Sequence, residues 1–451
     1  MKNTVTLNMA AALARFLSAQ YIARDGVEHR LINGVWGIFG HGNVTGLGQA
    51  IEEFGGRTLP YYQPKTEQAM VHAAIAFAKS RRRLGTFACT SSIGPGATNM
   101  LTGAATATIN RLPVLLLPGD IFANRRPGPV LQQLEYPASH DVSVNDCFRP
   151  VSKYWDRINR PEQILTALPE AMRVLADPAE TGAVTIALPE DVQAESCAYP
   201  RHFFAKRVYT VERPGASAES LRVAVAHIRA ARRPLVIAGG GVHYSDACDA
   251  LARLASATGL PVGVTQAGKG ALLDDHPACL GGIGVTGTEA ANRIALEADL
   301  VIGVGTRLSD FTTASKTQFQ NPRVRFIGVN LNAADARKHG ALPLVGDART
   351  ILAQLGRALA GWRVPAAAGA AVRRARADWD RTRAALVAPR PGVPLTQAQV
   401  IEEVNRACGP DGTVVHAAGG LPGDVHKLWR SRAHDDYHSE YGYSCMGYEI
   451  A

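Results

Sequence analysis

Residues 112–120 read LPVLLLPGD, an apolar run of strand length that closes with a proline, a glycine and an aspartate. A short run that is apolar on both faces is typical of a central strand in a parallel sheet, because helices cover such a strand on both sides. Similar runs lie at 34–40, 182–189, 234–241, 299–305, 325–331 and 412–418. Alanine-rich stretches between them, such as 218–232 and 246–258, predict helices. The alternation predicts an α/β fold of parallel sheets flanked by helices.

Two irregular stretches that contain prolines, near 194–216 and 362–394, interrupt this alternation. They predict three parts: an N-terminal α/β domain at 1–195, a central α/β domain at 205–362 and the start of a C-terminal domain at 393–451. The last part holds one predicted strand and a glycine-rich turn. It ends in SEYGYSCMGYEIA, in which a helix is expected to begin. We therefore expect the chain to stop inside its third domain.

The composition suits a globular protein with large cores, since 46% of the 451 residues are hydrophobic and 19% are charged. The net charge is +9, but the arginines are dispersed and only 6% of residues are aromatic. An anionic small molecule explains this charge as well as a nucleic acid does, and we expect no nucleic-acid partner. Seven scattered cysteines form no CxxC pair and no zinc-binding spacing, which predicts a reducing compartment.

The N-terminus predicts neither a secretory signal nor a membrane anchor. Leu7, Ala10, Ala14 and Leu17 lie on one face of a predicted amphipathic helix, and Arg15 lies off that face. No apolar run reaches the length that spans a bilayer. We therefore expect a cytoplasmic protein without a membrane partner.

Three loops that follow predicted strands of the first domain have unusual chemistry. They are GIFGHGN at 37–43, which displays His41 between two glycines, CTSSIGPGATNM at 89–100 and PGDIFANRRPG at 118–128. Open parallel sheets bind ligands at the carboxyl ends of their strands, so these loops are expected at a binding edge. A single glycine loop is more often a structural turn, so the interpretation depends on all three lying beside Glu67.

Glu67 opens a predicted helix in KTEQAMVHAAIAFAK, residues 65–79, which is otherwise rich in alanine and other apolar residues. We expect most of this helix to be buried, and the carboxylate with it. A buried carboxylate is costly unless something pairs with it, which indicates a functional group. The alternative is a first-turn glutamate that the helix dipole stabilises.

The order of these motifs resembles the thiamine diphosphate-dependent enzymes related to acetolactate synthase. The segments that carry the resemblance are GVWGIFGHGN, KTEQAMVHAAIAFAK, TSSIGPGATNMLTGAATATINRLPVLLLPGD, CFRPVSKYW, GAVTIALPEDV and, in the middle domain, DLVIGVGTRLSDF. The resemblance implies a pyrimidine-binding first domain, a Rossmann-like central domain and a diphosphate-binding third domain. It also implies thiamine diphosphate and Mg²⁺ as cofactors, and a homodimer or homotetramer whose site joins two subunits.

The resemblance implies roles for residues near both ends of the chain. Glu67 matches the glutamate that hydrogen-bonds the aminopyrimidine of the cofactor and promotes deprotonation of its thiazolium carbon. Ser444, Cys445 and Met446 match the segment that grips the aminopyrimidine. For Met446 the alternative is a methionine that fills a core.

Glycine-rich stretches outside the first domain are matched less specifically. Gly420 and Leu421, in AAGGLPGDVH at 417–426, match a turn that lies against the diphosphate, or they form a plain turn. The Gly-Asp-Gly motif that holds Mg²⁺ in the family is absent, so no metal ligand is assigned and this chain is expected to bind the cofactor weakly. The loop AGGGVHYSD at 238–246 matches a place where some relatives hold a flavin, and we expect a structural role for it.

Two histidines distinguish the chain from acetolactate synthases. His140 falls where those enzymes carry an active-site glutamine, and His41 falls where they usually carry glycine. Hydrolysis needs a group that delivers water and moves protons near neutral pH, which histidine can do. We hypothesise that His140 or His41 performs this step. The alternative for each is a histidine that is merely hydrogen-bonded within a loop.

The segments LINGVWGIFGHGNVTGLGQAI, HDVSVNDCFRPVSKYWDRI and EYGYSCMGYEIA are similar to a branch of the family that opens a cyclic 1,2-diketone by hydrolysis. This branch forms 5-deoxy-glucuronate in myo-inositol degradation, so a small cyclic diketone is the expected substrate. One alternative is a carboligase of the acetolactate synthase or glyoxylate carboligase type. Another is an inactive fragment or a non-catalytic subunit.

Overall fold

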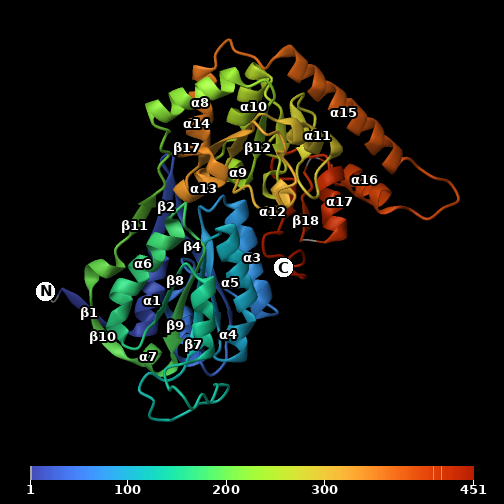
Figure 1. The fold of residues 1–451 in the computed structure, drawn as a ribbon. Helices are drawn as coiled ribbons and strands as arrows, with labels where there is room; N and C mark the ends of the chain where they lie inside the picture. The colour runs from blue at the N-terminus through green and yellow to red at the C-terminus, as the bar shows by residue number, and fades with distance from the viewer. Residues whose placement is uncertain (1–2, 410, 418) are drawn as a thin grey trace. The chain divides into compact units, whose positions relative to one another are not determined.

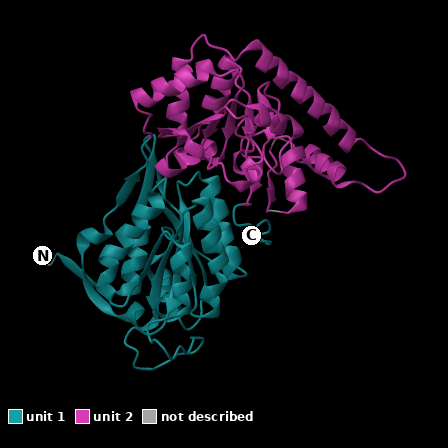
Figure 2. Cartoon of the chain, viewed as in Figure 1, with its two compact units in different colours: residues 1–212, 442–451 teal, residues 213–441 magenta. Residues whose placement is uncertain are grey.

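The computed structural model describes residues 3–409, 411–417 and 419–451. The chain divides into two compact units (Figure 2), of which unit 1 contains residues 1–212 and 442–451 and unit 2 contains residues 213–441. Each unit has a six-stranded sheet with helices packed against it (Figure 1), which confirms the predicted α/β class. The boundary after residue 212 falls within the first irregular stretch, while the division into three domains stays a prediction.

The large sheet of unit 1 has the strand order β5-β4-β6-β7-β9-β8, and every neighbouring pair is parallel. Its strands are β4 (Ile32–Ile38), β5 (Tyr61–Tyr62), β6 (Thr86–Ser91), β7 (Val114–Asp120), β8 (Tyr154–Arg157) and β9 (Ala183–Pro189). Every residue of β6, β7 and β9 is buried, as the apolar runs at 112–120 and 182–189 predict for β7 and β9. Because the strands run in one direction, the loops that follow them meet at one edge of the sheet.

The helices and smaller strands of unit 1 surround this sheet (Figure 1). The helices are α1 (Met9–Ser18), α2 (Gln49–Phe54), α3 (Glu67–Ser80), α4 (Pro95–Asn99), α5 (Leu101–Asn110), α6 (Ile164–Ala176) and α7 (Glu190–Ala194). Two small sheets pair β1 (Thr4–Asn8) with β10 (Ser196–Pro200), and β2 (Gln20–Arg24) with β3 (Val27–Arg30) and β11 (Arg207–Thr210). Helices α3 and α5 approach closely at Gly103, where an added Cβ would lie 2.5 Å from Val71 Cγ1.

The N-terminal helix differs from the predicted amphipathic helix in its start and in its surroundings. Leu7 lies in β1, and α1 begins only at Met9, because Asn8 caps the helix by accepting a hydrogen bond from the Ala11 amide at 2.8 Å. Eight of the ten residues of α1 are buried, so the helix is a core element.

The sheet of unit 2 has the strand order β14-β13-β12-β15-β16-β17 and is also parallel. Its strands are β12 (Pro234–Ala238), β13 (Val262–Val264), β14 (Cys279–Gly282), β15 (Leu300–Val304), β16 (Arg325–Asn330) and β17 (Leu342–Val345). The helices are α8 (Ala218–Ala230), α9 (Gly240–Tyr244), α10 (Cys248–Thr258), α11 (Glu289–Glu297), α12 (Asp310–Thr313), α13 (Ala333–Ala336), α14 (Ala348–Ala358), α15 (Ala366–Val387), α16 (Gln397–Cys408) and α17 (Gly420–Leu428). Helices α8 and α10 confirm the two predicted alanine-rich helices.

The end of the chain contains less regular structure than the sequence suggests. Strands β18 (Val414–His416) and β19 (Tyr437–Ser439) form a small parallel pair in unit 2. Residues 442–451 form turns, so the prediction that a helix begins there is wrong. Gly447 has φ of +98°, in the left-handed region that favours glycine, and its carbonyl oxygen accepts hydrogen bonds from the Ile450 and Ala451 amides. Within the described ranges, we find no helix whose length and apolar character suffice to cross a membrane.

Candidate active site

A pocket of about 740 Å³ lies in unit 1 at the edge where β4 and β6 end. Its lining comes from the loop after β4, the start of α3 and the loop after β6 into α4, with one residue from further along the chain: Phe39, Gly40, His41, Glu67, Ser92, Pro95, Gly96, Thr98, Asn99 and Gln132. The structure therefore brings Glu67 and His41 to one pocket. The loop at 118–128 does not line it, and Gln132 reaches the pocket in its place.

Glu67 is the first residue of α3 and stands on the pocket wall. Thr66 caps the helix by accepting a hydrogen bond from the Ala69 amide at 3.1 Å. Oε2 of Glu67 accepts a hydrogen bond from Asn99 Nδ2 at 2.8 Å. Oε1 faces Gly96, where an added Cβ would lie 3.1 Å away. The carboxylate is thus oriented by an amide donor on one side and given space by a glycine on the other.

The expectation that Glu67 is buried is wrong for this chain, because the residue is only half-buried. The buried side chains of α3 begin one turn later, at Met70 and Val71, whereas the first residue of the helix faces the open pocket. Stabilisation of a first-turn carboxylate by the helix dipole also applies to this geometry. Burial alone therefore does not separate the functional interpretation from its alternative.

His41 is fixed in a defined tautomer at the pocket. Its Nε2–H donates a hydrogen bond to the Leu131 carbonyl oxygen at 3.1 Å, and since a carbonyl only accepts, the hydrogen must reside on Nε2. Nδ1 is then the nitrogen that accepts a proton. Glu190 interacts electrostatically with the imidazole of His41. Burial raises the pKa of the Glu190 carboxyl group, and the interaction with His41 opposes that rise.

The glycines around His41 let two loops approach closely. An added Cβ on Gly40 would lie 2.6 Å from Ser92 Oγ, and one on Gly42 would lie 2.9 Å from the Ile93 amide nitrogen. Neither contact leaves room for a side chain. The glycines therefore hold the loop after β4 against the loop after β6, and His41 is presented from that junction.

His140 is not brought together with Glu67. It is exposed, and it lines a second pocket of unit 1, of about 340 Å³, that the segment 121–142 forms almost by itself. The sequence places His140 in a long loop whose course no local pattern predicts. The two histidines proposed for one step therefore line different pockets.

Residues 442–451 lie against helices α3 and α5 of unit 1. Gln68 Nε2 donates to Cys445 Sγ at 2.8 Å, and Thr106 Oγ1 donates to the Tyr443 carbonyl oxygen at 3.2 Å. Cys445 is half-buried and Ser444 is exposed. Among these ten residues, Cys445 thus contacts the residue that directly follows Glu67.

Met446 is 88% exposed, so the alternative that it fills a core is wrong. Gly420 and Leu421 are the first two residues of α17 in unit 2, where Leu421 is 49% exposed. Ala418, in the same predicted turn, lies outside the described residues. The cofactor roles suggested for Ser444, Cys445, Met446, Gly420 and Leu421 stay predictions.

The pocket fits the aromatic end of thiamine diphosphate. Its volume lies within the range of small-molecule sites, and its wall combines one carboxylate, two side-chain amides and the backbone of Gly40 and Gly96. No metal site is found among the described residues, because they contain no cluster of three or more His, Cys, Asp or Glu that could hold an ion.

Sequence reasoning missed Asn99 and Gln132. Asn99 lies three residues after Gly96 in the loop already singled out, so a search for amide donors near Glu67 would have found it. Gln132 reaches the pocket from a loop with no periodic pattern, and nothing in the sequence indicates this.

Two family models match the chain. Residues 8–139 match the N-terminal TPP binding domain of thiamine pyrophosphate enzymes, and residues 221–355 match the central domain of thiamine pyrophosphate enzymes. The fold, the pocket and these matches define the class of protein, a thiamine pyrophosphate enzyme.

Curated relatives narrow the class. The chain is 49% identical over 472 aligned residues to a 3D-(3,5/4)-trihydroxycyclohexane-1,2-dione hydrolase of Bacillus cereus, covering 99% of this chain and 73% of the relative. It is likewise 49% identical to the 3D-(3,5/4)-trihydroxycyclohexane-1,2-dione hydrolase of Geobacillus thermodenitrificans, covering 100% of this chain and 73% of the relative. The chain belongs to the family of thiamine pyrophosphate enzymes that contains these hydrolases.

Proposed function

We propose that the protein is a thiamine diphosphate-dependent hydrolase that opens 3D-(3,5/4)-trihydroxycyclohexane-1,2-dione to 5-deoxy-glucuronate in myo-inositol degradation. The observation that carries the proposal is the pocket that holds Glu67 and His41 together, in a chain 49% identical to hydrolases of this name. The proposal includes Mg²⁺ as a second cofactor, a homodimer or homotetramer, and a cytoplasmic location.

The reaction adds the elements of water across the bond between two adjacent carbonyl carbons. The hydroxyl group joins one carbon, which becomes a carboxylic acid, and a proton joins the other, which becomes an aldehyde. Thiamine diphosphate, when bound, supplies a carbon nucleophile and accommodates the electron pair that the broken bond leaves. The protein supplies position and proton transfer.

Glu67 has the role of hydrogen-bonding the aminopyrimidine of the cofactor. Asn99 orients its carboxylate through the contact at 2.8 Å, and Gly96 leaves Oε1 accessible. Ser444, Cys445 and Met446 are proposed to complete the aminopyrimidine site. The contact between Gln68 and Cys445 supports this, because it brings that segment to the first turn of α3.

His41 is the first candidate for moving the proton of the attacking water, because it lines the same pocket as Glu67 and has Nδ1 as its accepting nitrogen. His140 is the second candidate, acting from the second pocket. Gly420 and Leu421 are proposed to lie against the diphosphate.

The test combines binding with turnover. Because this chain is expected to bind the cofactor weakly, the purified protein is supplied with thiamine diphosphate and Mg²⁺ in large excess. It should then consume the cyclic dione and release 5-deoxy-glucuronate, and Glu67→Gln should abolish this. His41→Gln should keep cofactor affinity, measured by calorimetry, while turnover collapses; His140→Gln is the parallel variant. Consumption of the dione by the Glu67→Gln variant at the unsubstituted rate would refute the proposal.

Two alternatives give different results in the same experiment. A carboligase would convert pyruvate or glyoxylate to a condensed product and leave the dione unchanged. A non-catalytic subunit would show no calorimetric binding of thiamine diphosphate with Mg²⁺ and no turnover of any of these substrates.

A further inference from the structure

Residues 121–143, here called the crossing loop, connect β7 to the short helical turn Val144–Val151 without a helix or strand of their own. The crossing loop reaches the pocket at two consecutive residues. The Leu131 carbonyl accepts the Nε2–H of His41 at 3.1 Å, and Gln132 lines the pocket. An added Cβ on Gly94 would lie only 2.0 Å from the Gln132 carbonyl oxygen, so the loop rests directly on this glycine.

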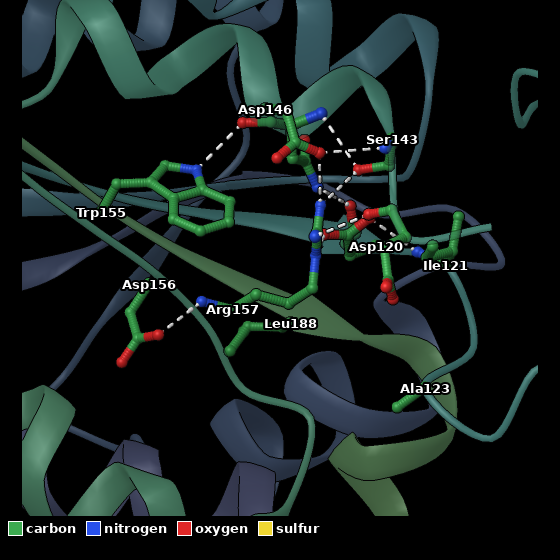
Figure 3. A network of polar contacts seen from close by, with 12 residues as sticks. Asp120, Ile121, Ala123, Ser143, Asp146, Trp155, Asp156, Arg157 and Leu188 are labelled. Atoms are coloured by element: carbon green, nitrogen blue, oxygen red, sulfur yellow. Dashed lines mark hydrogen bonds and ion pairs between the residues drawn. The ribbon is translucent and has the colours of Figure 1, made fainter. Parts of the chain in front are cut away.

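One side chain, Arg157 at the end of β8, joins the two ends of the crossing loop (Figure 3). Its Nε donates to Asp120 Oδ2 at 2.7 Å, just before the loop begins. Its Nη1 donates to the Asp141 carbonyl oxygen at 2.9 Å, and its Nη2 donates to Ser143 Oγ at 2.9 Å and to Asp146 Oδ2 at 2.8 Å, where the loop ends. All three nitrogens of the guanidinium are therefore used to close this loop.

The Asp120 end of the linkage is shielded from water, whereas the hydrogen bond to the Asp141 carbonyl oxygen is exposed. The side chain of Arg157 is 11% exposed and that of Asp120 is 0% exposed. Burial opposes the charge of Arg157, but the ion pairs and hydrogen bonds with Asp120 and Asp146 outweigh it and raise the pKa of Arg157. A lysine would keep the charge beside Asp120, but it would lose the planar fork that reaches several acceptors at once.

We propose that Arg157 is a positioning residue for His41. By joining both ends of the crossing loop, it fixes the Leu131 carbonyl, and that carbonyl fixes the orientation and the Nε2–H tautomer of the imidazole. Nδ1 is thereby kept as the proton acceptor in the pocket. The catalytic meaning of this arrangement rests on the proposed function, whereas the linkage from Arg157 to His41 does not.

The test compares Arg157→Lys with Arg149→Lys. Arg149 is a matched control, because its Nε also donates to Asp146, at 2.9 Å, and its guanidinium lies 3.7 Å from the centroid of the Trp155 ring. Unlike Arg157, it has no hydrogen bond to Asp120, Asp141 or Ser143 among the described residues. Nitrogen NMR of protein labelled with ¹⁵N-histidine reports the tautomer of His41 directly, and His41→Gln assigns the signal. Ser143→Ala is a milder second variant, because it keeps the buried pair of Arg157 with Asp120.

In the unsubstituted protein and in Arg149→Lys, neutral His41 should be present as the Nε2–H tautomer. In Arg157→Lys the Nδ1–H tautomer should appear beside it, in the minor proportion that an unrestrained neutral imidazole shows, and Ser143→Ala should shift it in the same direction by less. Trypsin cleavage of the Arg125–Arg126 bond should be about tenfold faster in Arg157→Lys, relative to cleavage within α15, because the loop opens more often.

A His41 tautomer that is unchanged in both Arg157→Lys and Ser143→Ala would overturn the proposal, whatever the cleavage rate. An equal tautomer shift in Arg149→Lys would also overturn the proposal, because loss of any arginine contact to Asp146 would then change the tautomer of His41. Turnover of the dione does not enter the measurement. The tautomer measurement therefore stays valid if the proposed function is wrong. A negative tautomer result likewise leaves the proposed function standing.

Discussion

Unit 1 should lose stability in mild acid because of His72, a buried histidine of α3. The residue is 1% exposed, its ring meets Tyr448 edge-on at 5.4 Å, and Nδ1 has no hydrogen-bond partner among the described residues. Burial lowers the pKa of His72 from 6.5 to about 4, and the charge of Glu449 opposes this shift only in part. Because the folded pKa lies below the unfolded one, the unfolded state binds more protons between these two values. The stabilisation is fully present above pH 6.5 and is lost as the pH falls through the window.

The two pKa values set the size of the effect. Linkage predicts that lowering the pH from 7.5 to 5.0 costs unit 1 about 2 kcal/mol through His72. In His72→Gln this loss disappears, so the free energy of opening should depend on pH less steeply by that amount. Hydrogen exchange of the buried amides of β6 measures the free energy of opening of unit 1 separately from unit 2.

His140→Gln is the matched control, because it removes an exposed histidine from the same unit. Its pH dependence should follow that of the unsubstituted protein. The reasoning is refuted if His72→Gln retains the full pH dependence, since the acid loss would then come from other groups.

Substitutions of Gly96 and Asn99 test the pocket, and substitutions of Lys269 and Asp274 test unit 2. Gly96→Ala should weaken thiamine diphosphate binding about tenfold by crowding Glu67, while the melting temperature changes by less than about 2 °C, since alanine suits a helix. Asn99→Ala should weaken thiamine diphosphate binding by about threefold to tenfold, because Glu67 loses its hydrogen-bond donor. Asn99→Asp should weaken the binding by more, because the aspartate places a second negative charge beside Glu67. Calorimetry measures both affinities. Lys269→Met should destabilise unit 2 by about 3–5 kcal/mol, because it leaves Asp274 without the cation now 2.8 Å away, and the double variant Lys269→Met/Asp274→Leu should recover part of that loss in denaturant unfolding.

The sequence predicted strands with long apolar runs, such as β7 and β9, and missed the edge strand β8, for a physical reason. β7 and β9 are covered on both sides, so their residues form uninterrupted apolar runs. β8 (Tyr154–Arg157) is an edge strand with half-buried residues, and its composition, YWDR, has no apolar run to detect. Its arginine, Arg157, donates hydrogen bonds to the crossing loop and does not pack in the core of the sheet.

Residues of the candidate site could be predicted from the sequence where the type of one side chain and its neighbours in the sequence are unusual. Glu67 and His41 stand out because of their type and their apolar or glycine-rich surroundings, and the structure places them in one pocket. The partner of His41 is the backbone carbonyl of Leu131, ninety positions away, and a backbone carbonyl has no signature in a sequence. Long-range contacts that use the backbone therefore set the protonation geometry of the site without being predictable from residue types.

Glycine loops illustrate how one sequence signal arises from two physical causes. In unit 2, an added Cβ on Gly239 would lie 2.5 Å from the Gly305 carbonyl oxygen, and one on Gly241 would lie 2.6 Å from the Gly305 Cα. The loops after β12 and β15 thus interlock through their backbones, and this packing accounts for the glycines at 239 and 241 without a ligand. In unit 1, by contrast, the space beside Gly96 opens onto the Glu67 carboxylate and the pocket. What a side chain would meet at each glycine therefore separates a packing role from a binding role, and it favours unit 1 as the place where chemistry occurs.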